Sequence, residues 1–108
     1  MNIVWTPEAE RDRAAIWDYL EARDPAAAVR MDRLFSDAVV QLADFPMLGH
    51  VGEIVGTREL TPHRSYRLVY EVVEDTVWIL VLIHTARQWP PHMNEAGNTE
   101  ANDGSRDL

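Results

Sequence analysis

The spacing of apolar residues changes once along this chain, across a stretch that contains Gly49, Gly52 and Gly56. Before these glycines, apolar side chains recur at three-and-four spacing, which is the period of one face of an α-helix. After them, short apolar or alternating runs are separated by turn residues, as in β-strands. A helical half followed by a strand half predicts an α+β fold, in which one layer of helices packs on one sheet.

Two start signals divide the helical half. Thr6-Pro7 and Asp24-Pro25 each combine a residue that can cap a helix with a proline at the first helical position. The sequence therefore predicts a helix from Pro7 to about Arg23 and a second that ends at Pro46, joined as an antiparallel hairpin. On the first helix, acidic side chains such as Asp12 are left for solvent. The apolar stripe of the second helix consists of Met31, Leu34, Phe35, Ala38, Leu42 and Phe45.

The remaining apolar runs predict strands. Ile3–Trp5 forms a short run before the first helix, and three further segments follow the glycines. These segments are Gly56–Leu60, Tyr66–Val73 and Val77 to about Thr85, with Glu74-Asp75-Thr76 as a hairpin turn between the last two. The expected fold class is α+β, with an N-terminal strand and a helical hairpin packed on an antiparallel β-sheet.

Both faces of this sheet are expected to be apolar. A strand covered on one side should alternate apolar with polar residues, yet Trp78, Leu80 and Leu82 are as apolar as their neighbours, and Val69 and Val73 join them. Two helices cover only one face of a small sheet. The second face then needs a cover from the C-terminal segment, a second copy or a partner protein. One alternative is that Trp89-Pro90-Pro91 folds back and covers it.

Length and composition bound the class of protein. A chain of 108 residues has room for a single domain, which we expect over residues 1–91, followed by a disordered acidic tail over 92–108. The absence of cysteine excludes disulfides and thiolate chemistry. The N-terminus lacks a signal peptide and the longest apolar run is too short to cross a bilayer, so we expect a soluble cytoplasmic protein without contact to a membrane.

The charges are unevenly placed. The net charge is −8, and all ten cations are arginine. Arg58, Arg64 and Arg67 face only Glu59 in their part of the chain, so they can form a local cationic patch. Pairing with the acidic helices is the alternative; it explains Arg64 equally well and Arg67 less well. The four histidines show no metal-ligand spacing and the glycines do not lie between a strand and a helix, so no metal and no cofactor are expected.

Five segments together resemble the RelE/ParE toxin family over about residues 1–91. They occur in the right order and on the right kinds of element. They are Trp5-Thr6-Pro7-Glu8-Ala9, the helical hairpin, Gly56-Thr57-Arg58-Glu59-Leu60, Tyr66-Arg67-Leu68-Val69-Tyr70 and His84-Thr85-Ala86-Arg87-Gln88-Trp89-Pro90. The resemblance implies a toxin that an antitoxin neutralises by wrapping around it, which agrees with the apolar second face.

The family includes two kinds of activity. RelE-like members cleave messenger RNA on the ribosome without metal, and ParE-like members poison DNA gyrase. The resemblance places Arg67 and Arg87 where RelE-like nucleases hold the phosphate, and such cleavage also needs groups that transfer protons. Candidates for proton transfer are His63, His84, Glu59 and Tyr66, although His84 could equally be a structural histidine.

Two departures favour the ParE-like activity. The chain has no lysine and its last motif ends in Gln88-Trp89-Pro90-Pro91, whereas RelE-like nucleases usually add lysines and a C-terminal aromatic or histidine. A net charge of −8 is also poorly suited to approaching dense phosphate. We therefore expect a protein target, DNA gyrase, rather than the ribosome and its mRNA.

The resulting hypothesis is a ParE-like toxin whose toxic surface includes Arg58, Arg67 and Arg87. Its antitoxin would bind the second sheet face, at Val69, Trp78, Leu80 and Leu82. Two alternatives remain. One is a RelE-like endoribonuclease that uses Arg67, Arg87, His63, Glu59 and His84, and the other is a non-toxic remnant that still binds an antitoxin.

Overall fold

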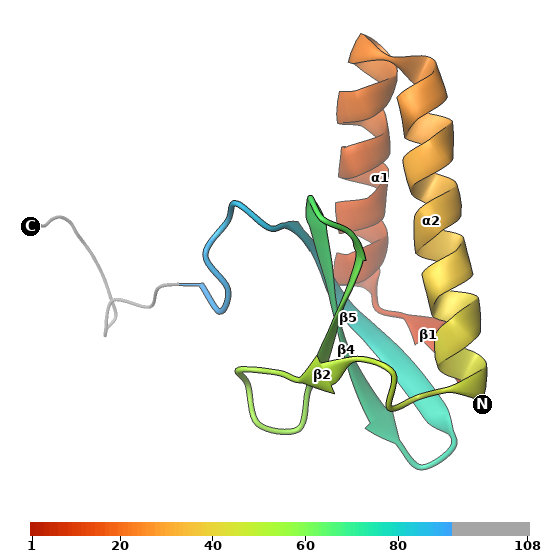
Figure 1. The fold of residues 1–108 in the computed structure, drawn as a ribbon, viewed down its shortest axis with the longest axis vertical. Helices are drawn as coiled ribbons and strands as arrows, with labels where there is room; N and C mark the ends of the chain where they lie inside the picture. Colours follow the sequence, from red (N-terminus) through yellow and green to blue (C-terminus); the bar gives the residue numbers. More distant parts are fainter. Residues whose placement is uncertain (92–108) are drawn as a thin grey trace, which may run out of the picture.

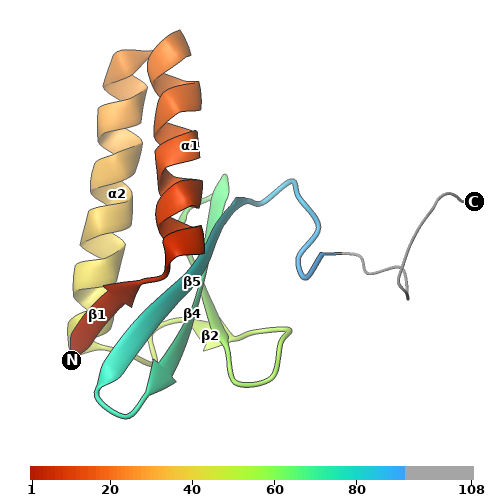
Figure 2. The ribbon, with the colours of Figure 1, turned by 180° about the vertical axis from the view of Figure 1, so that it is seen from behind.

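The computed structural model describes residues 1–91 of the chain, and the tail expected over 92–108 lies outside the described residues. A helical hairpin packs against one side of a twisted sheet (Figures 1 and 2). In chain order the elements are β1 (Asn2–Trp5), α1 (Pro7–Arg23), α2 (Pro25–Asp44), β2 (His50–Val51), β3 (Arg58–His63), β4 (Tyr66–Val73) and β5 (Thr76–His84). The α+β class and the hairpin on one sheet are confirmed.

Both helices begin at the predicted caps. The Thr6 hydroxyl accepts a hydrogen bond from the Ala9 N–H at 3.2 Å, and the Asp24 carboxylate accepts one from the Ala27 N–H at 3.2 Å. The Thr6 hydroxyl also donates to the Ile79 carbonyl at 2.9 Å. The start of α1 is therefore bonded to the middle of β5.

The sheet is mixed rather than antiparallel throughout. Its strand order is β1-β5-β4-β3-β2, and β1 pairs in parallel with β5 while the other pairs are antiparallel. The short edge strand β2 was not predicted, and β3 begins two residues later than expected and continues to His63. Because β1 joins a strand more than seventy positions away, its own sequence carries no signal for the direction of pairing.

The core lies between the hairpin and the sheet. The second helix contributes Phe35, Val39 and Leu42, which pack against buried residues of β4 and β5. Two members of the predicted stripe, Leu34 and Phe45, are exposed instead. Phe45 follows the last helical residue and so no longer shares the buried face, whereas Leu34 lies at the margin of that face.

A β-bulge interrupts the alternation of β5. Val69 pairs with Val81 and Tyr70 pairs with Ile79, which leaves Leu80 as an extra residue. The side chains after the bulge are shifted by one position, and Leu82 joins Ile79 in the core beneath the helices. The prediction that Leu82 shares the second face with Trp78 is therefore wrong.

The second face is partly covered by this chain. Val69 is completely buried, whereas Trp78 is 38% exposed. After β5 the chain leads away from the helical hairpin (Figures 1 and 2). In this segment Trp89 and Pro90 are half-buried, and the indole nitrogen of Trp89 is inaccessible to solvent. The expectation of an open second face thus holds near Trp78 and fails at Val69.

Candidate functional site

A buried carboxylate organises the sheet face away from the helices. Glu59 is 4% exposed and pairs in register with Val69. Its Oε1 lies 3.4 Å from Nε of Arg67 and 3.6 Å from Nε2 of His50, and its Oε2 accepts a hydrogen bond from the Glu53 N–H at 3.2 Å. The charge of Arg67 is thus balanced by a neighbour from its own chain, and the Glu59 oxygens already have partners.

Arg58 has a structural contact of its own. Its Nη1 donates a hydrogen bond of 2.6 Å to the Gly49 carbonyl, which fixes the chain just before β2. The buried Tyr70 hydroxyl donates to the Pro46 carbonyl at 2.7 Å and accepts from the Gly49 N–H at 2.9 Å. Burial raises the pKa of Tyr70, against smaller lowering effects of the Gly49 N–H and of Arg58. The hydroxyl therefore stays protonated and able to donate.

His84 and Arg87 line a groove on the helix side. This groove of about 760 Å³ runs between α1 and the ends of β4 and β5, and it also includes Tyr19 and Tyr66. The His84 ring meets the edge of Tyr66 at a centroid distance of 5.3 Å, and its Nδ1 accepts a hydrogen bond from the Ala86 N–H at 3.0 Å. A neutral His84 therefore carries its proton on Nε2, which is free to face a ligand.

The predicted catalytic residues fall into separate groups. Glu59 and Arg67 lie on the face away from the helices, whereas His84 and Arg87 belong to the groove beside α1. The separation follows from strand geometry, because Tyr66 and Arg67 are neighbours on β4 and point to opposite faces. His63 lies at the end of β3, where its Nδ1 accepts the Ser65 N–H at 3.0 Å. Among residues 1–91, no hydrogen bond or ion pair joins these groups.

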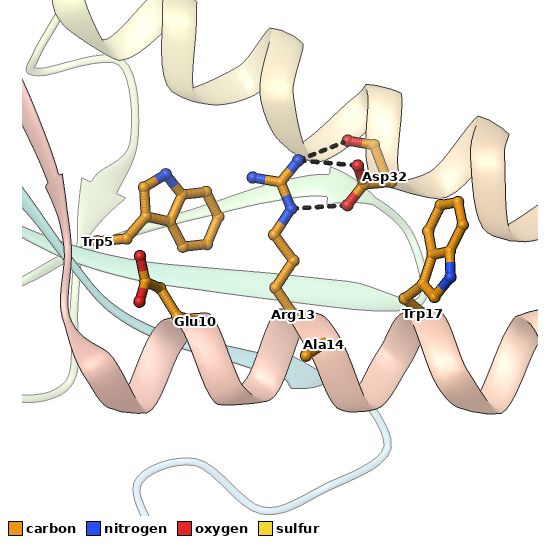
Figure 3. A pocket seen from close by; sticks show the side chains of 6 residues that line it. All are labelled: Trp5, Glu10, Arg13, Ala14, Trp17 and Asp32. Carbon is orange, nitrogen blue, oxygen red and sulfur yellow. Dashed lines mark hydrogen bonds and ion pairs between the residues drawn. The ribbon is translucent and has the colours of Figure 1, made fainter.

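An ion pair that the sequence analysis missed connects the two helices. Arg13 donates to the Asp32 carboxylate at 2.6 and 3.0 Å and to the Ser36 hydroxyl at 2.7 Å, and its guanidinium lies 4.8 Å from the Trp5 ring centroid. Trp5, Arg13 and Asp32 line an open hollow of about 490 Å³ that Trp17 also borders (Figure 3). The Nε and Nη2 atoms of Arg13 are engaged by Asp32 and Ser36, so this arginine links the two helices.

Asp12 also departs from its expected place in solvent. Its Oδ2 accepts a hydrogen bond of 3.1 Å from the Leu82 N–H, next to the bulge of β5. No local pattern distinguishes Asp12 from the exposed acids of α1, because its partner lies seventy residues away. Within the described residues, no group of three His, Asp or Glu side chains could hold a metal ion, and no helix is long and apolar enough to span a membrane.

Comparison with known families decides the classification. The model of the family described as "ParE toxin of type II toxin-antitoxin system, parDE" matches residues 3–89. The chain belongs to this ParE toxin family. This ParE-family toxin is also similar to the protein Y4kP of Sinorhizobium fredii, with 39% identity over 82% of this chain and 93% of the relative. Toxin RelE2 of Caulobacter vibrioides is 35% identical, over 80% of this chain and 97% of its own.

A solved structure agrees with the family. The chain is similar to a structure described as the chromosomal ParDE TA system from P. aeruginosa, with a TM-score of 0.69 and 25% identity. The match covers 78% of this ParE-family toxin and 95% of the other chain. The resemblance to RelE/ParE toxins inferred from five short segments is confirmed, and the protein is a toxin of the type II toxin-antitoxin class.

Proposed function

We propose that this toxin is held inactive by an antitoxin and that its target is DNA gyrase. The observation that carries the choice of target is the ion pair of Arg67 with the buried Glu59. An arginine that already neutralises a buried carboxylate is a poor ligand for a scissile phosphate, because binding the phosphate would leave Glu59 unpaired. This pairing, together with the placement of His84 on the other side of the sheet, argues against a site for RNA cleavage on one surface of the described chain.

The similarity to a ParDE system supports an antitoxin as partner. In our proposal the antitoxin covers the part of the second sheet face that this chain leaves open, at Trp78 and the half-buried Leu80. Val69 and Leu82 are buried, so they are not available for contact with the antitoxin. We further propose a cytoplasmic location, which the absence of cysteine favours.

The toxic surface is centred on Arg87 in this proposal. Arg58 and Arg67 are engaged by Gly49 and Glu59, whereas Arg87 is exposed and lines the groove beside α1. An exposed arginine at the rim of a groove can pair with an acidic group of a partner protein. Arg58 and Arg67 then contribute by holding the surrounding backbone and sheet in place.

Inhibition of purified gyrase tests the proposal. The wild-type toxin should inhibit DNA supercoiling, and Arg87→Ala should lose at least tenfold in potency while its circular dichroism stays unchanged. Arg64→Ala is the matched control, because Arg64 is also an exposed arginine and lies at the same end of the sheet, where the Thr85 hydroxyl donates to its carbonyl. An equal loss in both variants would argue against a specific role for Arg87.

The ribonuclease alternative is favoured by one observation, namely that His84 and Arg87 line the same groove. Cleavage of mRNA in a translating extract, lost in His84→Ala and without any effect on gyrase, would replace our proposal with that activity. A wild-type protein that inhibits neither gyrase nor translation but binds its antitoxin would be the non-toxic remnant.

A further inference from the structure

The segment between α2 and β3 exposes an unusual number of large apolar side chains. We call residues 45–55 the apolar loop. It contains six of the thirteen exposed large apolar residues among residues 1–91, with exposed fractions between 41% and 98%. Figure 1 shows the loop running from the end of α2 to the outer edge of the sheet, away from the hairpin. The six residues are Phe45, Met47, Leu48, Val51, Ile54 and Val55.

The backbone of the apolar loop is fixed by residues of the sheet. Tyr70 bonds both the Pro46 carbonyl and the Gly49 N–H, and Arg58 bonds the Gly49 carbonyl. Farther along the loop, the Glu59 carboxylate accepts a hydrogen bond from the Glu53 N–H. The Gly52 N–H donates a hydrogen bond to the Thr57 carbonyl at 2.8 Å. These anchors are buried or half-buried, so the loop is held against the sheet at both ends.

Two glycines show how closely the loop is held. A Cβ atom on Gly49 would lie 2.6 Å from the Glu59 carbonyl oxygen and 2.9 Å from the Tyr70 hydroxyl. A Cβ atom on Gly52 would collide with the Thr57 hydroxyl. The backbone is therefore in close contact with its neighbours at Gly49 and Gly52, while the large apolar side chains of the loop stay exposed. A preorganised apolar surface of this kind is typical of a protein interface.

The charge around the apolar loop selects the kind of partner. Asp44 directly precedes the loop, Glu53 lies in it and the Glu71 carboxylate lies beside Gly56 at its end, whereas Arg58, which also contacts the loop, is bonded to the Gly49 carbonyl. A second copy would bring the same acidic surface against itself, and residues 92–108 carry one arginine against four acids. Both candidates within this chain are thus disfavoured by like charge, and a separate protein with cationic residues fits best.

We propose that the apolar loop is a docking site for a segment of the antitoxin that combines apolar side chains with lysine or arginine. The identity of the partner rests on the proposed function. A permanent partner fits better than a transient target, because an apolar surface that stays uncovered promotes aggregation of the free protein. Gly56, directly after the loop, lies beside Glu71 of β4, and Glu71 pairs in register with Trp78 of β5, so one antitoxin segment could cover both surfaces.

Affinity measurements with charged variants test this site. The probe is the antitoxin encoded beside the toxin gene. Val51→Asp and Val55→Asp should each raise its dissociation constant at least tenfold, because each places a carboxylate in the apolar contact. Val29→Asp is the matched control, since Val29 is an exposed valine of α2 far along the chain from the loop. It should change the dissociation constant less than twofold, and all three should keep the unfolding midpoint of the wild type.

The charge of the partner is tested separately. Asp44→Lys should weaken binding, and added salt should weaken binding of the wild type more than that of this variant. Unchanged affinity in the two loop valine variants, with a stable wild-type complex, would overturn the docking site and leave the proposed function standing. Loss of self-association in these variants without loss of antitoxin affinity would assign the loop to a second copy instead. Absence of any wild-type complex would refute the antitoxin proposal itself.

Discussion

Glu59 is the one charged side chain that is buried among residues 1–91. Arg67, His50 and the Glu53 N–H surround its carboxylate, so it connects β3 to β4 and to the apolar loop. The sequence identifies Glu59 and Arg67 as chemically capable residues near one another. It could not show that they neutralise each other, because their pairing depends on the register of two strands.

Removal of Arg67 should destabilise the fold. We expect Arg67→Ala to lower the free energy of unfolding by about 1–3 kcal/mol, because the buried Glu59 loses its strongest partner. Adding Glu59→Gln should recover part of this loss, since a neutral amide costs less to bury than a carboxylate. Urea denaturation measures both effects. The control Arg64→Ala should stay within about 0.5 kcal/mol of the wild type, and a loss as large as that of Arg67→Ala would contradict the argument.

Two of the three tyrosines should make stability sensitive to alkali. Burial raises the pKa of Tyr66, helped by Tyr19, and burial also raises the pKa of Tyr70 above the ordinary value of 10.0. Folding therefore favours their protonated forms, and this stabilisation is complete below the unfolded pKa and disappears as pH rises through the folded pKa. Thermal unfolding should show a midpoint that falls above about pH 10. A midpoint that is constant through this range would contradict the raised pKa values.

At the scale of elements, the helical hairpin depends on contacts of both helices with each other and with the sheet. The first helix has only Ala9 fully buried, so it gains less from the core than α2 does. Arg13 compensates through its bonds to Asp32 and Ser36, and Thr6 ties the start of α1 to β5. The position of α1 beside the groove of His84 and Arg87 follows from these polar contacts.

The interhelical ion pair should therefore contribute to stability. We expect Arg13→Ala to cost about 1.5–3 kcal/mol, the usual range for hydrogen bonds to a charged group. Arg11→Ala provides the comparison, because Arg11 sits on the same helix in a highly exposed pair with Glu8 and should cost at most about 1 kcal/mol. Thermal and urea unfolding distinguish them. Similar losses for both variants would mean that the Arg13 contacts are no stronger than a surface pair.

An element could be predicted when the residues that determine it lie close together in the sequence. Thr6-Pro7 and Asp24-Pro25 marked both helix starts correctly, because a cap bonds a residue three positions away. The bulge at Leu80 could not be predicted, since it depends on pairing with β4. Because the bulge was not predicted, Leu82 was placed on the wrong face and His84 was grouped with Arg67 and Glu59, which lie on the other face of the sheet.

For the whole molecule, the order of elements was enough to predict the fold class and the family, but not the arrangement of the site. The predicted catalytic residues are spread over two faces of the sheet. Strand alternation could have predicted the face of Arg67, which lies within β4, but not the position of Arg87, which follows the end of β5. The apolar loop was seen only as a glycine-rich break. Its exposed side chains become significant once the buried anchors Tyr70, Arg58 and Glu59 are known.

The position of β5 between β1 and β4 has a consequence for how the protein is made. The first strand of the chain cannot pair until the last has been synthesised, and α1 lacks its bonds to Ile79 and Leu82 until then. The core of a growing polypeptide therefore cannot close before β5 has been synthesised. A fragment that ends before Thr76 would lack a central strand of the sheet together with the partner of β1.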